Sequence, residues 1–174
     1  MNEKTLLIPL DSDSAYHYNS NHLFSLRRIL FDMNNNNLPR ILIVEDDQTF
    51  RETVCEVLRD AGYKVRGARS LNKATKRLTH HKFDLVLSDL ELGKHSGFEV
   101  LEVANKTHPN AKIMLMSGSG DPELVQQALD SGAKRFLSKP FRVKELLRSV
   151  EELLESANAD DEKAQKDKKD KDGT

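Results

Sequence analysis

Three carboxylates, a hydroxyl and an ammonium group lie along this chain at spacings that can assemble one reactive site: Glu45, Asp46, Asp89, Ser117 and Lys139. Clustered carboxylates repel one another, and a divalent cation relieves that repulsion. Magnesium suits such a cluster because it takes oxygen ligands and completes its shell with water and phosphate oxygens. A carboxylate in this setting can attack phosphorus and form an acyl phosphate. The residues therefore favour a magnesium-assisted phosphoryl transfer, and Asp89 is the predicted acceptor.

Each of the other groups has a predicted part in that chemistry. Asp46 and Asp89 are expected to bind Mg²⁺ directly, whereas Glu45 acts through a bound water. The backbone carbonyl of Glu91, two residues past Asp89, is expected to supply a further oxygen ligand.

Lys139 and Ser117 are predicted to contact the transferred group. The lysine is a point charge that can pair with Asp89 and then with a phosphoryl oxygen. The Ser117 hydroxyl can donate to another phosphoryl oxygen. Pro140 follows Lys139, which makes a cis peptide bond possible at this position.

Apolar runs that alternate with helical patterns explain how distant residues meet. Apolar runs predict strands at 41–44, 83–88 and 113–116, and shorter, less apolar patterns predict strands at 64–68 and 135–138. Apolar residues at helical spacing predict helices at 49–61, 71–78, 98–108, 122–131 and 143–154. Strands that alternate with helices pair in parallel through right-handed crossovers, with helices on both faces. Ligands of such sheets bind beyond the carboxyl ends of the strands, which is where the candidate residues fall.

Composition sets the outer limits on function. The chain has 174 residues, a net charge of -1 and 37% hydrophobic residues, which is enough for one domain with a core. Residues 39–157 are the predicted domain, 1–38 a partly disordered N-terminal extension, and 158–174 a charged disordered tail. The near-neutral charge gives no global basic field, so no direct contact with nucleic acid is expected. No apolar run is long enough to span a membrane.

Cys55 is the only cysteine and lies in a helical pattern. It cannot form an internal disulfide, so we expect a reduced residue in or near the core. A cytoplasmic location is the corresponding default.

Four motifs resemble the receiver domain of two-component response regulators: Ile41–Asp47, Asp84–Leu90, Ser96–Leu101 and Phe136–Phe141. The resemblance covers about residues 39–157, with landmarks in the family's order. It implies a flavodoxin-like α/β fold, doubly wound, whose five parallel strands take the order 2-1-3-4-5 in a (βα)5 arrangement. It also implies Asp89 as phosphoacceptor, Glu45 and Asp46 as the acidic pair, and Asp47 as a residue that is not itself a ligand.

The same resemblance implies partners. The phosphoryl group would come from a sensor histidine kinase or a histidine phosphotransfer protein, with Mg²⁺ as cofactor. The protein would be a switch that dephosphorylates itself and not a turnover enzyme. Because little sequence follows residue 157, we expect a stand-alone, chemotaxis-type receiver that acts on a downstream protein target.

Signal output is expected from Ser117 and Phe136, the predicted switch residues. Many family members carry Tyr or His where this chain has Phe136. The readout surface would be the 4-5-5 face, residues 121–131, 136–138 and 143–154, through which a homodimer is also possible. A second departure is Gly93-Lys94, where many members have Pro-Gly; it is expected to loosen the loop after Asp89.

Two other classes of function are compatible with a sheet of this kind. A receiver fold that takes no phosphate and serves only as an interaction module is the alternative, although Asp46, Asp89, Ser117 and Lys139 argue against it. An enzyme on a similar sheet is disfavoured. No glycine-rich dinucleotide motif follows Val44, and the segment after Asp89 lacks the threonine of an aspartate-based phosphatase motif.

Overall fold

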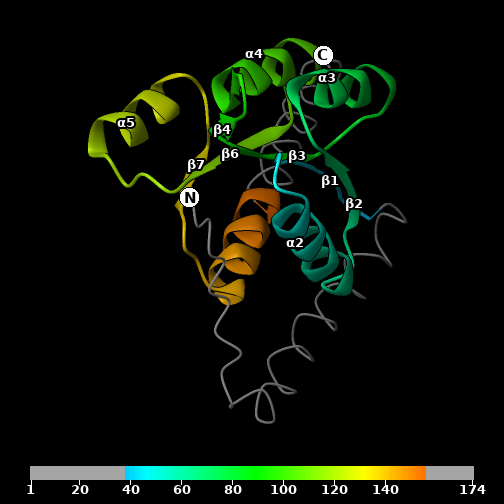
Figure 1. Ribbon diagram of the computed structural model, residues 1–174. Coiled ribbons are helices and arrows are strands. Elements are labelled where there is room, and N and C mark those ends of the chain that lie inside the picture. Colours follow the sequence, from blue (N-terminus) through cyan, green and yellow to red (C-terminus); the bar gives the residue numbers. More distant parts are fainter. Residues whose placement is uncertain (1–37, 156–174) are drawn as a thin grey trace, which may run out of the picture.

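The computed structural model describes residues 38–155, which form a parallel five-stranded sheet covered by helices on both faces (Figure 1). The sheet order is β2-β1-β3-β6-β7, and every neighbouring pair is parallel. Its strands are β1 (Arg40–Val44), β2 (Lys64–Ala68), β3 (Leu85–Asp89), β6 (Lys112–Ser117) and β7 (Arg135–Ser138). Counted along the chain, this is the predicted order 2-1-3-4-5. The predicted tail, and all but residue 38 of the predicted extension, lie outside the described residues.

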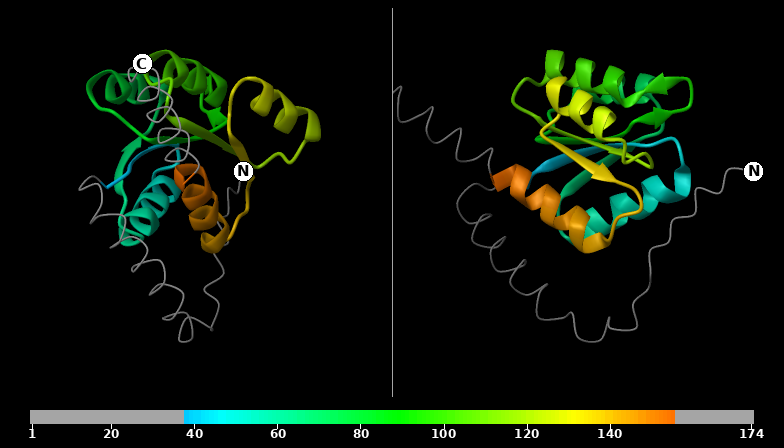
Figure 2. Two further views of the ribbon diagram at one scale, coloured as in Figure 1. Left: turned by 180° about the vertical axis from the view of Figure 1, so that it is seen from behind. Right: turned by 90° about the vertical axis from the view of Figure 1, so that its left-hand side faces the viewer.

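Five helices connect or follow these strands. They are α2 (Gln48–Asp60), α3 (Leu71–His80), α4 (Gly97–Thr107), α5 (Pro122–Asp130) and a C-terminal helix at residues 143–155. Figures 1 and 2 show α2 and the C-terminal helix on one face of the sheet, and α3, α4 and α5 on the other. No helix among residues 38–155 is both long and apolar enough to cross a membrane.

Side-chain caps explain where the helices begin. Asp47 accepts a hydrogen bond from the backbone N–H of Phe50 and caps α2, and Ser70 caps α3. Ser96 and Glu99 form a reciprocal capping box at the start of α4. Asp121 caps α5, whose first residue is a proline that needs no backbone donor there.

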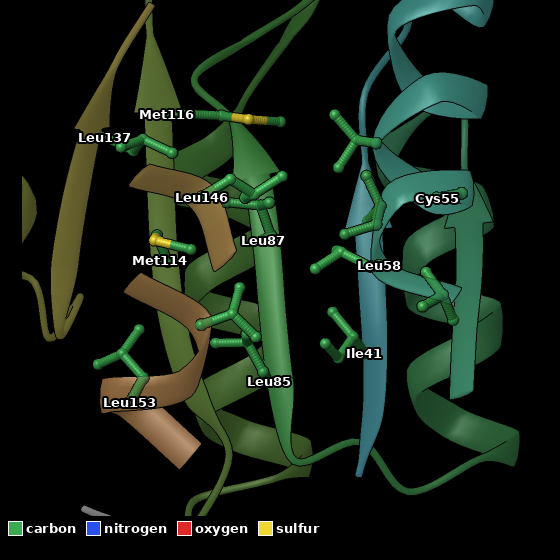
Figure 3. Packing of buried hydrophobic residues seen from close by; sticks show 14 of the residues in the cluster. Ile41, Cys55, Leu58, Leu85, Leu87, Met114, Met116, Leu137, Leu146 and Leu153 are labelled. Atoms are coloured by element: carbon green, nitrogen blue, oxygen red, sulfur yellow. The ribbon is translucent and has the colours of Figure 1, made fainter. Parts of the chain in front are cut away.

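The sheet separates two hydrophobic clusters. Along β1, Ile41 and Ile43 face α2 and the C-terminal helix, while Leu42 and Val44 face the other layer. Figure 3 shows the first cluster, in which Leu58 of α2 and Leu146 of the C-terminal helix pack against the strands. The central strands are thus buried on both faces, as their continuous apolar runs predict.

Two local features differ from or refine the sequence predictions. The third sheet strand begins at Leu85 and ends at Asp89, two residues later than predicted at its start, so Asp89 is part of the strand. Cys55 is buried in the first cluster, and burial raises the pKa of its thiol. An unreactive, reduced core residue is what this environment favours.

Candidate functional site

The strand ends bring the predicted residues to one edge of the sheet. Glu45 directly follows β1, Asp89 ends β3 and Ser117 ends β6. Lys139 directly follows β7, and its backbone N–H donates to the carbonyl of Ser117 at 2.7 Å. One carboxylate oxygen from each of Glu45, Asp46 and Asp89 lies within 4.8 Å of the others. The residues predicted to form one site are therefore neighbours in space.

Lys139 is the positive centre of this cluster. Its Nζ donates to Glu45 Oε2 at 2.7 Å and to Asp89 Oδ2 at 2.9 Å. Glu45 is fully buried and Asp89 is 2% exposed, whereas the lysine side chain keeps 19% of its surface in solvent. Two buried carboxylates are costly unless a cation compensates them, and this ammonium does so for both.

The surroundings of Glu45 disfavour its ionised form and raise its pKa. Burial raises its pKa to about 7, while the hydrogen bond and charge of Lys139 act in the opposite direction. The charge of Asp89 adds to the rise, because two neighbouring carboxylates disfavour each other's ionised form. Additional positive charge at this position would favour the ionised state of Glu45.

The donor set fits a hard divalent cation. Three carboxylate oxygens converge within 4.8 Å, and Asp46 is exposed at the mouth of the cluster while Glu45 and Asp89 are buried. Carboxylate oxygens with an open, solvent-facing side are what Mg²⁺ requires, because it retains waters and adds phosphate oxygens.

The loop between β1 and α2 is held by Arg51, a residue whose role was not anticipated from the sequence. Its Nη1 donates to the carbonyl oxygen of Glu45 at 2.8 Å, and to those of Asp46 and Asp47 at 3.3 and 3.4 Å. The Asp47 carboxylate is occupied as the cap of α2, with its Oδ1 2.7 Å from the Phe50 nitrogen. One oxygen of the Asp47 carboxylate is therefore engaged by the helix cap.

Phe50 is a second site residue that sequence analysis missed. The Nζ of Lys139 lies 4.3 Å from the centroid of the Phe50 ring, and Phe141 packs edge-on against that ring at 5.8 Å. Its spacing in the sequence predicts only that Phe50 lies on the apolar face of a helix. The one available indication was its position in the first helical turn after the acidic residues, which puts it at the same sheet edge.

A Phe50→Leu variant should retain the fold but slow phosphorylation by acetyl phosphate roughly 2- to 30-fold, because cation–π contacts contribute about 0.5–2 kcal/mol. Leucine fills much of the volume but offers no negative ring face to the lysine. Time-resolved intact-mass measurements would give the rate. Phe83→Leu, a buried phenylalanine in the other cluster, is the control for general destabilisation. Equal rates for the two variants would show that the Phe50 ring does not position Lys139.

Ser117 and Phe136 occupy different environments. Ser117 is 1% exposed, and its Oγ accepts the backbone N–H of Ser119 at 3.0 Å. Within residues 38–155, no hydrogen bond joins the Ser117 side chain to Asp89. Phe136 is half-buried and packs against the cluster beneath α3, α4 and α5. The structure therefore places Ser117 at the carboxylate edge and Phe136 in the adjoining hydrophobic layer.

The segment after Asp89 is paired, contrary to the expectation of a loosened loop. β4 (Glu91–Leu92) and β5 (His95–Ser96) form a short antiparallel pair, with Gly93 in the turn at a φ of +65°. Leu92 is buried and anchors this hairpin. The Glu91 side chain is exposed and is not part of the carboxylate cluster, so any role of this residue would fall to its backbone carbonyl.

Gly97 presses the start of α4 against the backbone of Asp89. A Cβ added at Gly97 would overlap the carbonyl oxygen of Asp89 and lie 3.0 Å from the Cα of Leu90. The Gly97 nitrogen also donates to the Leu90 carbonyl at 2.9 Å. The absence of a side chain here is what allows α4 to approach the end of β3.

Gly97→Ala should therefore lower the free energy of unfolding by about 3 kcal/mol, at the upper end of the overpacking range, because backbone atoms are the obstacle. Urea denaturation measures the loss. Gly120→Ala is the matched control, since its Cβ would meet only Ser138 Oγ at 4.0 Å. If the two variants unfold at the same urea concentration, the close approach is not tight.

The Lys139-Pro140 peptide bond is cis, a form that the proline after Lys139 makes possible.

Comparisons with known proteins agree with this architecture. The response regulator receiver domain model matches residues 41–151. The chemotaxis protein CheY of Thermotoga maritima is 35% identical over 115 residues, which are 64% of this chain and 96% of CheY. The nitrogen assimilation regulatory protein NtrX of Azorhizobium caulinodans is 31% identical over 118 residues, or 67% of this chain but only 26% of NtrX.

A solved structure is also similar over most of its length. The CheY-like receiver domain protein from Methanospirillum hungatei JF-1 superimposes with a TM-score of 0.68 at 30% identity, covering 71% of this chain and 99% of that one. Because the family model spans more than half of the chain and the sheet order is the one the resemblance implies, this chain belongs to the response regulator receiver domain family.

Proposed function

We propose that this protein is a phosphorylation switch in which Asp89 accepts a phosphoryl group from a histidine kinase or a histidine phosphotransfer protein. The observation that carries the proposal is the Lys139 ammonium bridging Glu45 and Asp89 at the edge where three carboxylates converge. An ion pair of purely structural purpose would not need a third, exposed carboxylate beside it.

The reaction follows from the charges of the site. An oxygen of Asp89 forms a bond to phosphorus while the phosphorus–nitrogen bond to the donor histidine breaks, and the imidazole leaves with a proton. Lys139 is already 2.9 Å from Asp89 Oδ2 and can follow the developing charge onto a phosphoryl oxygen. Ser117, buried at the neighbouring strand end, can turn its hydroxyl to a second phosphoryl oxygen.

Mg²⁺ would be held by Asp46 and Asp89 directly, by Glu45 through water and by the Glu91 carbonyl. When bound, it supplies positive charge that draws the phosphoryl oxygens toward the carboxylates. Within the protein, Arg51 fixes the backbone that carries Glu45 and Asp46, so their carboxylates are positioned before any ligand arrives.

Output is proposed to occur through the 4-5-5 face, which comprises α5, β7 and the C-terminal helix in the labels of Figure 1. Of the described residues, Leu129 of α5 is the only large hydrophobic residue that is exposed, at 41%. Ala128 is the only buried residue of α5, so this helix buries fewer residues than the other helices among residues 38–155. Movement of Ser117 toward the phosphate, with adjustment of Phe136, would alter this face and its contacts with a downstream protein or a second copy of the chain. The protein would dephosphorylate itself, and its kinase partners suggest a cytoplasmic location.

Incubation of the purified chain with acetyl phosphate and Mg²⁺ should add one phosphoryl group, detected by intact-mass spectrometry. Removal of Mg²⁺ with EDTA should abolish this addition, because three neighbouring carboxylates then repel the incoming phosphate. Uptake that is equal with and without EDTA would contradict the metal requirement. The absence of uptake with Mg²⁺ present would instead favour a receiver fold that serves only as an interaction module.

A further inference from the structure

The charges of this chain are unevenly distributed, which its net charge of -1 conceals. Residues 61–83 contain no aspartate or glutamate. They contain seven lysine and arginine residues, Lys64, Arg66, Arg69, Lys73, Lys76, Arg77 and Lys82, together with two histidines. The segment therefore carries a formal charge of +7 when its histidines are neutral, and the rest of the chain is correspondingly acidic.

This basic segment forms one edge of the molecule. β2 is the outermost strand of the sheet, and α3 packs beside it on the upper face in Figure 1. Six of the seven basic side chains are exposed, and Arg77 is half-buried. Arg69, Lys73 and Lys76 also line an open depression of about 280 Å³, together with Ser70 and Asn72. We call the exposed basic residues of β2, α3 and the connection between them the basic edge: Lys64, Arg66, Arg69, Lys73 and Lys76.

Nothing in the described part of the protein neutralises the basic edge. Within residues 38–155, none of its five residues forms an ion pair, and the buried Nε of Arg77 has no hydrogen-bond partner. Other helices differ: Lys106 pairs with Glu102 four residues away. In α3, Lys73 instead faces Lys76 and Arg77 at helical spacing, where like charges destabilise a helix.

The positive charges of this region affect the ionisation of a neighbouring histidine. The pKa of His81 is lowered, first by burial and then by the positive charges of Arg66, His80, Arg40 and Arg77. Residues from β1, β2 and α3 thus contribute to one region of positive potential. Such a region attracts anions and raises their local concentration.

The chemistry of the edge indicates what kind of anion it suits. Protein–protein interfaces have an apolar or aromatic centre, but the only exposed large hydrophobic residue among those described is Leu129, on α5 beside the opposite edge strand. Nucleic acid interfaces are instead polar and strongly basic. Lys64 and Arg66 lie on β2, and Lys73 and Lys76 lie on α3. With Arg69 in the connection between them, the positive charges are spread over two elements and not concentrated at a point.

We propose that the basic edge binds the phosphodiester backbone of a nucleic acid, through Arg69, Lys73 and Lys76 in the depression and Lys64 and Arg66 on the adjoining strand. This revises the expectation, based on net charge alone, that the chain makes no direct contact with nucleic acid. The contacts would be to phosphate and not to bases, because lysine and arginine here neutralise charge without aromatic side chains on which bases could stack.

Fluorescence anisotropy of the full-length protein with labelled single-stranded RNA and duplex DNA tests the proposal. Binding should weaken steeply as salt is raised from about 50 to 200 mM. Replacing Arg69, Lys73 and Lys76 together by glutamine should weaken binding at least tenfold and flatten the salt dependence, since each lost phosphate contact removes about 0.9 from the logarithmic slope for duplex DNA. Arg69→Lys with Lys73→Arg and Lys76→Arg should retain binding.

A matched control removes the same charge elsewhere: Lys94→Gln, Lys134→Gln and Lys144→Gln, all exposed positions outside the basic edge. This variant should bind as the wild type does. The proposal is overturned if the wild type does not bind at about 50 mM salt or if the control weakens binding equally. It is also overturned if polyglutamate binds the basic edge more tightly than either nucleic acid, because an acidic protein would then be the partner.

Discussion

Asp89→Asn should take up no phosphoryl group from acetyl phosphate in the presence of Mg²⁺. The substitution preserves the size of a side chain that is 2% exposed, so the packing of β3 should survive. The amide, however, lacks the negative charge and the nucleophilic oxygen that an acyl phosphate requires. Lys139 keeps its 2.7 Å hydrogen bond to Glu45, which leaves the ammonium in place. Intact-mass spectrometry over time measures the uptake.

Asp47→Asn is the matched control for this experiment. Asp47 lies in the same acidic loop, but its carboxylate caps α2, a role that asparagine fulfils equally well. This variant should be phosphorylated at close to the wild-type rate. Uptake by Asp89→Asn at the wild-type rate would mean that the phosphoryl group is bound elsewhere.

Lys139→Met should slow phosphorylation about 100- to 1,000-fold, the usual effect of removing one donor that stabilises developing negative charge. The methionine side chain occupies a similar volume but cannot hydrogen-bond to Glu45 or to Asp89. Without Lys139, the hydrogen bond and the positive charge that lower the pKa of Glu45 are lost. This buried carboxyl should therefore be largely protonated at neutral pH. Mg²⁺ binding should survive, because Asp46 and Asp89 remain as ligands and a competing cation has gone.

Measuring Mg²⁺ affinity and the phosphorylation rate in the same variant makes the prediction specific to the proposed role of Lys139. Lys139→Met should lower the phosphorylation rate but retain Mg²⁺ binding. Neither quantity should change in Lys134→Met, which replaces an exposed lysine five residues earlier. If Lys139→Met loses Mg²⁺ binding together with phosphorylation, the lysine supports the structure of the cluster and not the transferred group.

The strand ends show why much of the site could be predicted. Ile41, Leu85 and Met114 belong to apolar runs that must be buried in parallel strands, and parallel strands align their carboxyl ends. The first polar residue after each run is therefore placed at a common edge without knowledge of any contact. Glu45, Asp89 and Ser117 lie at the strand ends that this rule predicts, and the strand order is the one that the family resemblance implies.

Other parts of the site depend on three-dimensional contacts that periodicity does not contain. Phe50 looks like an ordinary core residue, and only the fold shows Lys139 above its ring. Arg51 looks like a solvated helical residue, yet it holds three loop carbonyls. The two strands around Gly93 have only two residues each, which is too short to produce an apolar pattern. The Gly93-Lys94 dipeptide, in place of the family's usual Pro-Gly, therefore suggested a loose loop where the backbone in fact forms a paired hairpin.

The basic edge illustrates a different reason for a missed feature. A net charge of -1 averages residues that are far apart in the fold, and it therefore hid the exposed basic residues on and between β2 and α3. A sliding charge count along the sequence would have detected residues 61–83. Whether the charges share one surface, however, depends on how the strand and helix pack.

The central claim, that Asp89 becomes an acyl phosphate, is tested most directly by locating the modification. Borohydride reduces an aspartyl phosphate to homoserine, so the wild-type protein can be phosphorylated with acetyl phosphate and Mg²⁺, reduced, digested and analysed by tandem mass spectrometry. The site geometry predicts homoserine at position 89 and at no other aspartate. Homoserine at Asp46 or Asp47, or a phosphoryl group retained on serine or histidine with position 89 unchanged, would contradict the assignment of Asp89.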